Sequence, residues 1–201
     1  MKYLKMLGLA AVAAAALTAL IGAGTASATV LCKTTSTPCN SIYGKGTVLA
    51  TSLSGSNQIE TTSGSTLTTC TGTSTKATIE NAGGSASTVV APLTEMVASG
   101  CSSAVTTLKL GTLEVHHIAG TDNGTITGLF SEVTTALFGT SCTYGAGTGI
   151  DAGTLTGGEA PTIKVNEIVK RVAGGFICPA EVRWTAEYKV TSPKPLYVEA
   201  S

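Results

Sequence analysis

The stretch Glu181-Val-Arg-Trp-Thr-Ala-Glu-Tyr-Lys-Val190 decides the fold class of this chain. Apolar and polar residues alternate strictly along it, and the apolar positions are Val182, Trp184, Ala186, Tyr188 and Val190. Successive side chains of a β-strand point to opposite faces of a sheet, so this alternation is typical of a strand with one buried and one solvated face. We therefore predict a strand over residues 181–190.

The same β texture covers most of the chain on the N-terminal side of that strand. Thr, Ser and Gly dominate, β-branched residues are common, and turn residues recur at short intervals. Asn123-Gly124 suits a tight turn and predicts a hairpin between strands at 113–118 and 125–130. Weaker patterns predict strands at 47–53, 66–70, 73–80, 87–97, 104–110, 132–137 and 162–172.

One of the predicted strands breaks its own alternation. In residues 162–172, Ile163 and Val165 take the apolar positions, but the next such position falls on Glu167. An extra residue in one strand of a pair resets the alternation. We therefore expect a β-bulge near Asn166.

The number and shortness of the predicted strands determine the architecture that we expect. Many short strands with frequent turns predict an all-β fold, either an antiparallel β-sandwich or a partly open barrel. The only tryptophan, Trp184, follows the last cysteine, which disagrees with a standard immunoglobulin domain. Residues 29–201 have the length of one ordinary domain.

The first 28 residues have the composition of a secretory signal peptide. Lys2 and Lys5 form a short positive region, an apolar run covers 6–21, and Ala26 and Ala28 supply the small residues that a signal peptidase reads. An uncleaved anchor is the alternative, but the run is shorter than the roughly 20 residues that a spanning helix needs. We expect a signal helix over 1–28, a mature β domain over 29–201 without a stable membrane span, and a secreted or extracytoplasmic location.

All the cysteines of the chain lie in the part expected to be exported: Cys32, Cys39, Cys70, Cys101, Cys142 and Cys178. An even number of cysteines in an oxidising compartment predicts disulfides, here three of them. The connectivity is open, and sequential pairing (32–39, 70–101, 142–178) is the simplest. Structural zinc is the rival interpretation, but no two cysteines have the close C-x2-C spacing of such a site.

The charged residues point to no nucleic-acid partner. Lys and Arg number 12, as do Asp and Glu, so the formal net charge is zero. The densest cationic spot is the pair Lys170-Arg171, which is ordinary for a protein surface. Without a basic patch, the chain has no electrostatic footprint for nucleic acid.

The residues that could carry chemistry form no recognisable constellation. His116 and His117 are neighbours in a predicted strand and point to opposite faces, so they cannot share a metal. His116 and Glu114 share a face, where a solvated surface pair is the simpler reading. His117 and Asp122 could serve a serine, but no G-x-S-x-G motif is present. The carboxylates available for glycoside hydrolysis, without any pairing signal, are Glu114, Glu132, Glu159, Glu181 and Glu187.

Neither a calcium site nor a cofactor site is indicated. Asp122 and Asp151 lie in Gly-rich turns without the spacing of a calcium loop. No Gly-rich stretch precedes a helical pattern with a lysine, so a phosphate-binding loop is also missing. We predict no catalytic residue, no metal and no cofactor.

Several segments give the chain a family resemblance. They are Thr29-Val-Leu-Cys32 after the signal, Gly120-Thr-Asp-Asn-Gly-Thr125, Phe138-Gly-Thr-Ser-Cys-Thr-Tyr-Gly145 and Pro195-Leu-Tyr-Val-Glu-Ala-Ser201. With them the chain resembles, over essentially its full length, a group of uncharacterised exported, Thr/Ser/Gly-rich β-proteins of actinobacteria. The resemblance implies export and a single β domain, and it transfers no functional residue.

Three functional hypotheses follow from the sequence. The leading one is a secreted or cell-envelope-associated, non-catalytic protein of structural or interaction type. The first alternative is an extracytoplasmic binding module for an envelope glycan or a small apolar ligand, for which Tyr43, Tyr144 and Tyr197 are the only loose aromatic residues, since Trp184 and Tyr188 are expected in the core. The second alternative is a hydrolase.

Overall fold

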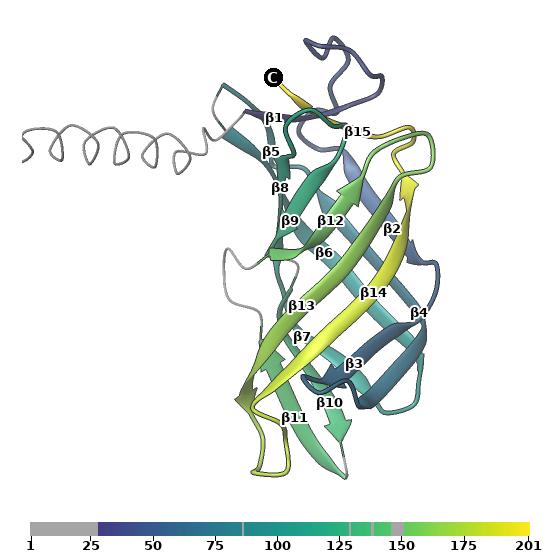
Figure 1. The fold of residues 1–201 in the computed structure, drawn as a ribbon, viewed down its shortest axis with the longest axis vertical. Coiled ribbons are helices and arrows are strands. Elements are labelled where there is room, and N and C mark those ends of the chain that lie inside the picture. The colour runs from purple at the N-terminus through teal and green to yellow at the C-terminus, as the bar shows by residue number, and fades with distance from the viewer. Residues whose placement is uncertain (1–27, 86, 129, 138, 146–150) are drawn as a thin grey trace, which may run out of the picture.

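The structure is a computed structural model that describes residues 28–85, 87–128, 130–137, 139–145 and 151–201 (Figure 1). The expected signal helix, apart from Ala28, lies outside these residues. The described chain forms strands and turns, which confirms the all-β fold class. No helix in this part of the chain has the length and apolar character needed to cross a membrane.

The strands follow one another without interruption by other elements. Their bounds are β1 Thr29–Cys32, β2 Val48–Leu53, β3 Asn57–Thr61, β4 Thr66–Thr78, β5 Asn81–Gly84, β6 Ser87–Cys101, β7 Val105–Leu110, β8 Thr112–His117, β9 Gly124–Thr127, β10 Phe130–Leu137, β11 Thr140–Gly145, β12 Asp151–Thr156, β13 Thr162–Ala173, β14 Glu181–Ser192 and β15 Tyr197–Ala200.

The strands form one antiparallel sheet that curls into a ring-like partial barrel, the second of the two architectures that the sequence left open. Pairing runs from β6 through β8, β9, β12, β13, β14 and β2 to β4, and β4 pairs with β6 to close the ring. In the other half of the molecule β3 lies between β14 and β4, while β7, β10 and β11 form a ladder that joins β13 (Figure 1).

Four long strands connect the two halves. β4, β6, β13 and β14 have 12 to 15 residues each, longer than the segments predicted from sequence. The predicted strands at 66–70 and 73–80 are one strand, β4, because Gly72 continues the ladder opposite Ser99. A Cβ at position 72 would meet Ser99 Oγ, which instead donates to the Gly72 carbonyl at 3.2 Å. The lack of a side chain at position 72 thus leaves room for the Ser99 hydroxyl, and the ladder continues through this position.

The hairpin predicted around Asn123-Gly124 is confirmed, with a longer turn. β8 and β9 pair from Glu114 opposite Thr127 to His117 opposite Gly124. The residue with left-handed backbone is Gly120, at φ 76°, three positions after the end of β8 at His117. Gly124 serves a different purpose, because a Cβ there would lie 2.8 Å from Val115 Cγ1.

The bulge expected near Asn166 is wrong. β13 and β14 pair without any shift of register, from Thr162 opposite Lys189 to Lys170 opposite Glu181. The regular alternation therefore continues through Glu167, which points into the ring and is only 1% exposed. Its apolar sequence neighbour Ile168 points outward and is 42% exposed.

The structure contains three disulfides, the number that the even count of cysteines predicted. The bonds are Cys32–Cys39, Cys70–Cys101 and Cys142–Cys178, which is the sequential pairing. The first closes a loop after β1, the second joins β4 to β6, and the third joins β11 to the loop between β13 and β14. Cross-links of this kind fit an oxidising environment.

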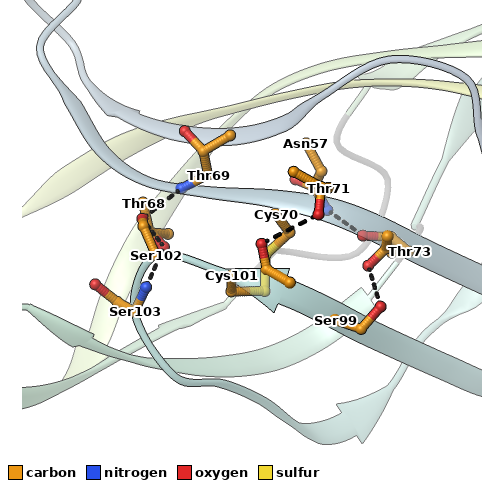
Figure 2. The surroundings of a disulfide bond; sticks show 12 residues. Asn57, Thr68, Thr69, Cys70, Thr71, Thr73, Ser99, Cys101, Ser102 and Ser103 are labelled. Carbon is orange, nitrogen blue, oxygen red and sulfur yellow. Dashed lines mark hydrogen bonds between the residues drawn. A yellow bond between two sulfur atoms is a disulfide. The ribbon is translucent and has the colours of Figure 1, made fainter.

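Hydroxyl groups support the second disulfide where β4 meets β6 (Figure 2). Cys70 and Cys101 are directly opposite each other in the ladder. Beyond them, the Ser102 hydroxyl accepts from the Thr69 amide at 3.0 Å, and the Thr68 hydroxyl accepts from the Ser103 amide at 3.2 Å. The turn that follows β6 is therefore tied to β4 by side chains as well as by sulfur.

Candidate functional site

A polar network crosses the interior of the ring. The Asn57 side chain on β3 accepts from Trp184 Nε1 at 2.6 Å and donates to Thr73 Oγ1 at 3.1 Å and to the Tyr188 hydroxyl at 3.4 Å. All four residues are buried, Trp184 and Tyr188 as the alternation of β14 predicts. The network links β3, β4 and β14 inside a mainly apolar core, so its role is in packing.

Two cavities lie next to this network, and both are small. One is lined by Asn57, Trp184 and apolar residues of several strands, the other by Thr75, Tyr188 and further apolar residues. Each has a volume of about 30 Å³. That is the space of about one water molecule, whereas ligand pockets have several hundred Å³. These cavities give a small apolar ligand no room.

Glu167 is the one ionisable side chain of β13 that points into the ring. It lies directly opposite Trp184 on β14 and two residues from Val169, which lines the first cavity. Neither carboxyl oxygen has a hydrogen-bond partner. Burial alone raises the pKa of Glu167 to about 7. No hydrogen bond joins Glu167 to a second acid or base among the described residues.

Polar groups also gather at the end of the molecule where β8, β1 and β15 meet. His117 Nε2 lies 2.8 Å from the Thr121 carbonyl, so Nε2 carries the proton, and the His117 amide donates to Thr29 Oγ1 at 2.8 Å. Burial and, second, the charge of Asp122 raise the pKa of Glu199, an effect that His117 partly offsets. His117 thus fixes the turn after β8 and lowers the pKa of Glu199, and its Nδ1 has no hydrogen-bond partner among the described residues.

The carboxylates considered for hydrolysis are not brought together. Each contacts a different partner: Glu114 lies 3.9 Å from His116 Nε2, Glu132 pairs with Lys109, Glu187 lies 3.9 Å from Lys164, and Glu159 accepts from the Tyr197 hydroxyl at 3.0 Å. Glu181 is exposed at the start of β14. Among the described residues, no three His, Cys, Asp or Glu side chains are placed to hold a metal ion.

The aromatic residues considered for glycan binding do not form a platform. Tyr144 is 1% exposed inside the ring, although its sequence suggested a turn. Tyr43 is also buried, and its hydroxyl donates to the Pro195 carbonyl at 2.6 Å. Only Tyr197 keeps partial exposure. The proposed surface of three tyrosines is therefore wrong.

The exposed aromatic residue that sequence reasoning missed is Phe176. It lies in the loop 174–180 between β13 and β14 and is 94% exposed, next to Ile177 at 46%. A signal was available in Gly174-Gly-Phe-Ile-Cys-Pro179, where two large apolar residues stand between turn residues and beside a cysteine. A Gly/Pro-rich turn gives such side chains nothing to pack against.

A disulfide, several hydrogen bonds and a close approach at a glycine fix the conformation of the 174–180 loop. Cys178 is bonded to Cys142 on β11, and the Cys178 amide donates to the Gly175 carbonyl at 3.1 Å. Arg171 Nη1 donates to the Gly175 carbonyl at 2.9 Å and to the Cys178 carbonyl. Gly174 has φ 126°, and a Cβ there would lie 2.7 Å from the Cys178 sulfur. The loop therefore presents Phe176 from a rigid base.

Positive charge accompanies this apolar tip. Lys170 and Arg171 lie at the end of β13, and the ion pairs formed among the described residues include neither of them. A shallow surface hollow lies beside them, lined also by Thr61, Thr62 and the start of β14. An exposed aromatic side chain on the loop thus lies near two cations at the end of β13.

Of the candidate sites, only the 174–180 loop combines exposed side chains with a fixed conformation. Glu167 is buried without a partner, and His117 holds a turn.

Comparison of the chain with protein-family models, with curated proteins and with solved structures found no match.

Proposed function

We propose that this chain is a secreted or cell-envelope-associated, non-catalytic β-domain protein that acts by binding a partner. Its contact surface is the 174–180 loop. The observation that carries the proposal is Phe176, which is 94% exposed although its loop is fixed by a disulfide and by Arg171.

The energetic reason lies in the cost of presenting an apolar side chain to water. Burial of a Phe side chain is worth roughly 1.5–3 kcal/mol, which the free protein forgoes at position 176. A loop that is already ordered loses little entropy on binding, and aromatic residues are common among those that contribute most to binding. Phe176 on this loop has both properties.

The extracytoplasmic location rests on two features. The three disulfides fit an oxidising compartment. Residues 1–28 carry the pattern of a signal peptide. Intact mass of the protein from culture medium tests this part: we expect the mass of residues 29–201 less two hydrogens for each disulfide. Free thiols or a retained N-terminal segment would contradict it.

The two alternatives have weaker support. A module for a small apolar ligand needs a larger cavity than the two of about 30 Å³ in the ring, and a glycan module needs exposed aromatics that Tyr43 and Tyr144 do not provide. A hydrolase needs acid–base groups near each other, and the carboxylates described above lie apart.

Site-specific cross-linking tests the contact surface. A photoreactive benzoyl-phenylalanine replaces Phe176 in one variant and Val97 in a control; Val97 is 48% exposed on β6. Both variants are added to cells of the secreting strain and irradiated. Adducts with envelope material at position 176, and few at position 97, support the proposal. Equal or no adduct formation at both positions would rule out the loop as the contact surface.

A further inference from the structure

We infer that the partner of the 174–180 loop is an anionic lipid surface, into which Phe176 and Ile177 insert. This inference rests on the proposed function, because it takes the loop as the contact surface and names what it contacts.

The shape of the apolar surface favours a lipid over a protein partner. The 174–180 loop between β13 and β14 lies at one end of the long axis of the molecule (Figure 1), and it carries the exposed residues Phe176 and Ile177. A stable protein interface buries about 800 Å² on each partner, which needs a broad face. A membrane interface instead closes around a narrow tip and receives apolar side chains to a depth of about 5–10 Å.

The charges around the tip have the sign that an anionic surface attracts. Lys170 and Arg171 stand at the base of the loop and take part in none of the ion pairs formed by the described residues. The carboxylate nearest to them along the ladder is Glu181, opposite Lys170, so the base remains net positive. Apolar side chains at the tip and cations at the base match the order of acyl chains and phosphate groups in a bilayer.

Two carbonyl groups of the loop already have hydrogen-bond partners within the protein. An unsatisfied carbonyl group costs several kcal/mol inside a membrane. The Gly175 carbonyl accepts from the Cys178 amide and from Arg171, and the Cys178 carbonyl accepts from Arg171. Both carbonyls keep these partners when the loop enters the interface, so insertion leaves them paired.

Vesicle binding tests the inference with the oxidised, full mature protein. Co-sedimentation is measured with vesicles of phosphatidylglycerol and phosphatidylcholine and with vesicles of phosphatidylcholine alone. We expect binding to the anionic vesicles that weakens at high salt. Phe176→Ser should reduce it about tenfold or more, while the control Val48→Ser, which changes a 45% exposed residue on β2, should leave it unchanged.

A second pair of variants tests whether the cations at the base of the loop contribute to vesicle binding. Lys170→Gln should weaken binding to anionic vesicles by about fivefold. The control Lys189→Gln, which changes an exposed residue of β14, should have no effect. In a Phe176→Trp variant, tryptophan emission should shift to shorter wavelength on anionic vesicles. No binding to these vesicles, or equal binding by Phe176→Ser, would overturn the inference.

Failure of this inference and failure of the proposed function give different results. Cross-links from position 176 to an envelope protein, without vesicle binding, would leave the loop as the contact surface and replace lipid by protein as its partner. Absence of both cross-links and vesicle binding would remove the proposed function as well.

Discussion

Glu167 is the residue whose environment conflicts most with its chemistry. It occupies an apolar position of β13, opposite Trp184, and both carboxyl oxygens are without a partner. Burial of an unpaired charge is costly, so the group stays protonated over a wider range of pH. Its pKa is raised from 4.5 to about 7. The residue therefore makes the stability of the fold depend on pH.

The direction of that dependence follows from proton linkage. Between about pH 4.5 and 7 the folded chain holds a proton on Glu167 that the unfolded chain has released. The free energy of unfolding therefore falls as pH rises through this window, by on the order of 3 kcal/mol, and stays low above it. Urea unfolding of the wild type at pH 5 and pH 8 measures the change.

Two variants isolate Glu167 from other groups that titrate. Glu167→Gln should remove most of the difference in the free energy of unfolding between pH 5 and pH 8, because its side chain does not ionise. Glu187→Gln, at an exposed position of β14, should keep the wild-type difference. If Glu167→Gln and the wild type change equally with pH, Glu167 is not the source.

At the scale of single residues, the sequence showed that Glu167 occupies an apolar position of its strand, but it did not show how the fold accommodates this residue. The alternation placed Glu167 in an apolar position, and we expected a bulge to remove the conflict. Whether the strand bulges depends on its partner, and β14 has an unbroken alternation that fixes the register over the whole ladder. The cost of burying one carboxyl group is less than the cost of shifting every later pair to the wrong face.

At the scale of elements, β1 depends on one glycine of β5. Val30 lies opposite Gly83, which has φ 82°. A Cβ at position 83 would fall on the Thr29 carbonyl oxygen. The close approach of β1 to β5 therefore requires glycine both for its backbone angle and for its lack of a side chain.

Replacement of that glycine should loosen β1. We expect Gly83→Ala to lower the free energy of unfolding by about 2 kcal/mol or more, because strain and clash add. The control Gly55→Ala has open space around the new Cβ and no positive φ, and should change stability by less than about 1 kcal/mol. Thermal unfolding followed by circular dichroism compares the two; equal effects would mean that β1 tolerates the added methyl group.

The disulfide Cys142–Cys178 fixes the 174–180 loop to β11, and its removal should free that loop. The double variant Cys142→Ala/Cys178→Ala should lose about 3–4 kcal/mol of stability on the chain-entropy model. Chymotrypsin should cleave it after Phe176 faster than it cleaves the wild type under native conditions. Cys32→Ala/Cys39→Ala, at the other end of the molecule, serves as the control. An unchanged cleavage rate would show that the hydrogen bonds of the loop order it without the disulfide.

Element by element, the sequence located most strands because alternation is a local property. Predicted strands at 181–190 and 113–118 correspond to β14 and β8. The split of β4 at Gly72 was wrong because glycine in a strand marks a weak point only when nothing compensates, and here Ser99 fills the space. Phe176 was missed because strand alternation was the pattern used to place apolar residues, whereas its signal lies in a turn, Gly174-Gly-Phe-Ile-Cys-Pro179.

Two strand pairings close the whole molecule, one between strands that are near each other in sequence and one between strands that are far apart. The pairing of β4 with β6 completes the ring, and β15 pairs with β1 over its full length, from Thr29 opposite Ala200 to Cys32 opposite Tyr197. β15 is not a member of the ring. Its contribution is to cover β1 and the end of the barrel, where Val198 is fully buried.

Truncation of the C-terminal strand distinguishes the contribution of the β1–β15 pairing from that of the β4–β6 pairing. Deletion of residues 197–201 removes the partner of β1 and the buried Val198, and should lower the free energy of unfolding by about 3 kcal/mol. The ring itself should persist, so the near-ultraviolet circular dichroism of Trp184 should be retained. Deletion of Ser201 alone is the control. A truncated chain with no near-ultraviolet signal would show that the ring depends on β15.

The class of the fold and the positions of most strands could be predicted without the structure, because alternation, turn residues and cysteines act within a few residues of each other. Three features became known only from the folded chain: the strands close into a partial barrel, Glu167 lies inside it, and Phe176 lies outside on a fixed loop. Each of these depends on which distant segment becomes the neighbour, and pairing across a sheet is a property of the whole chain rather than of any stretch of it.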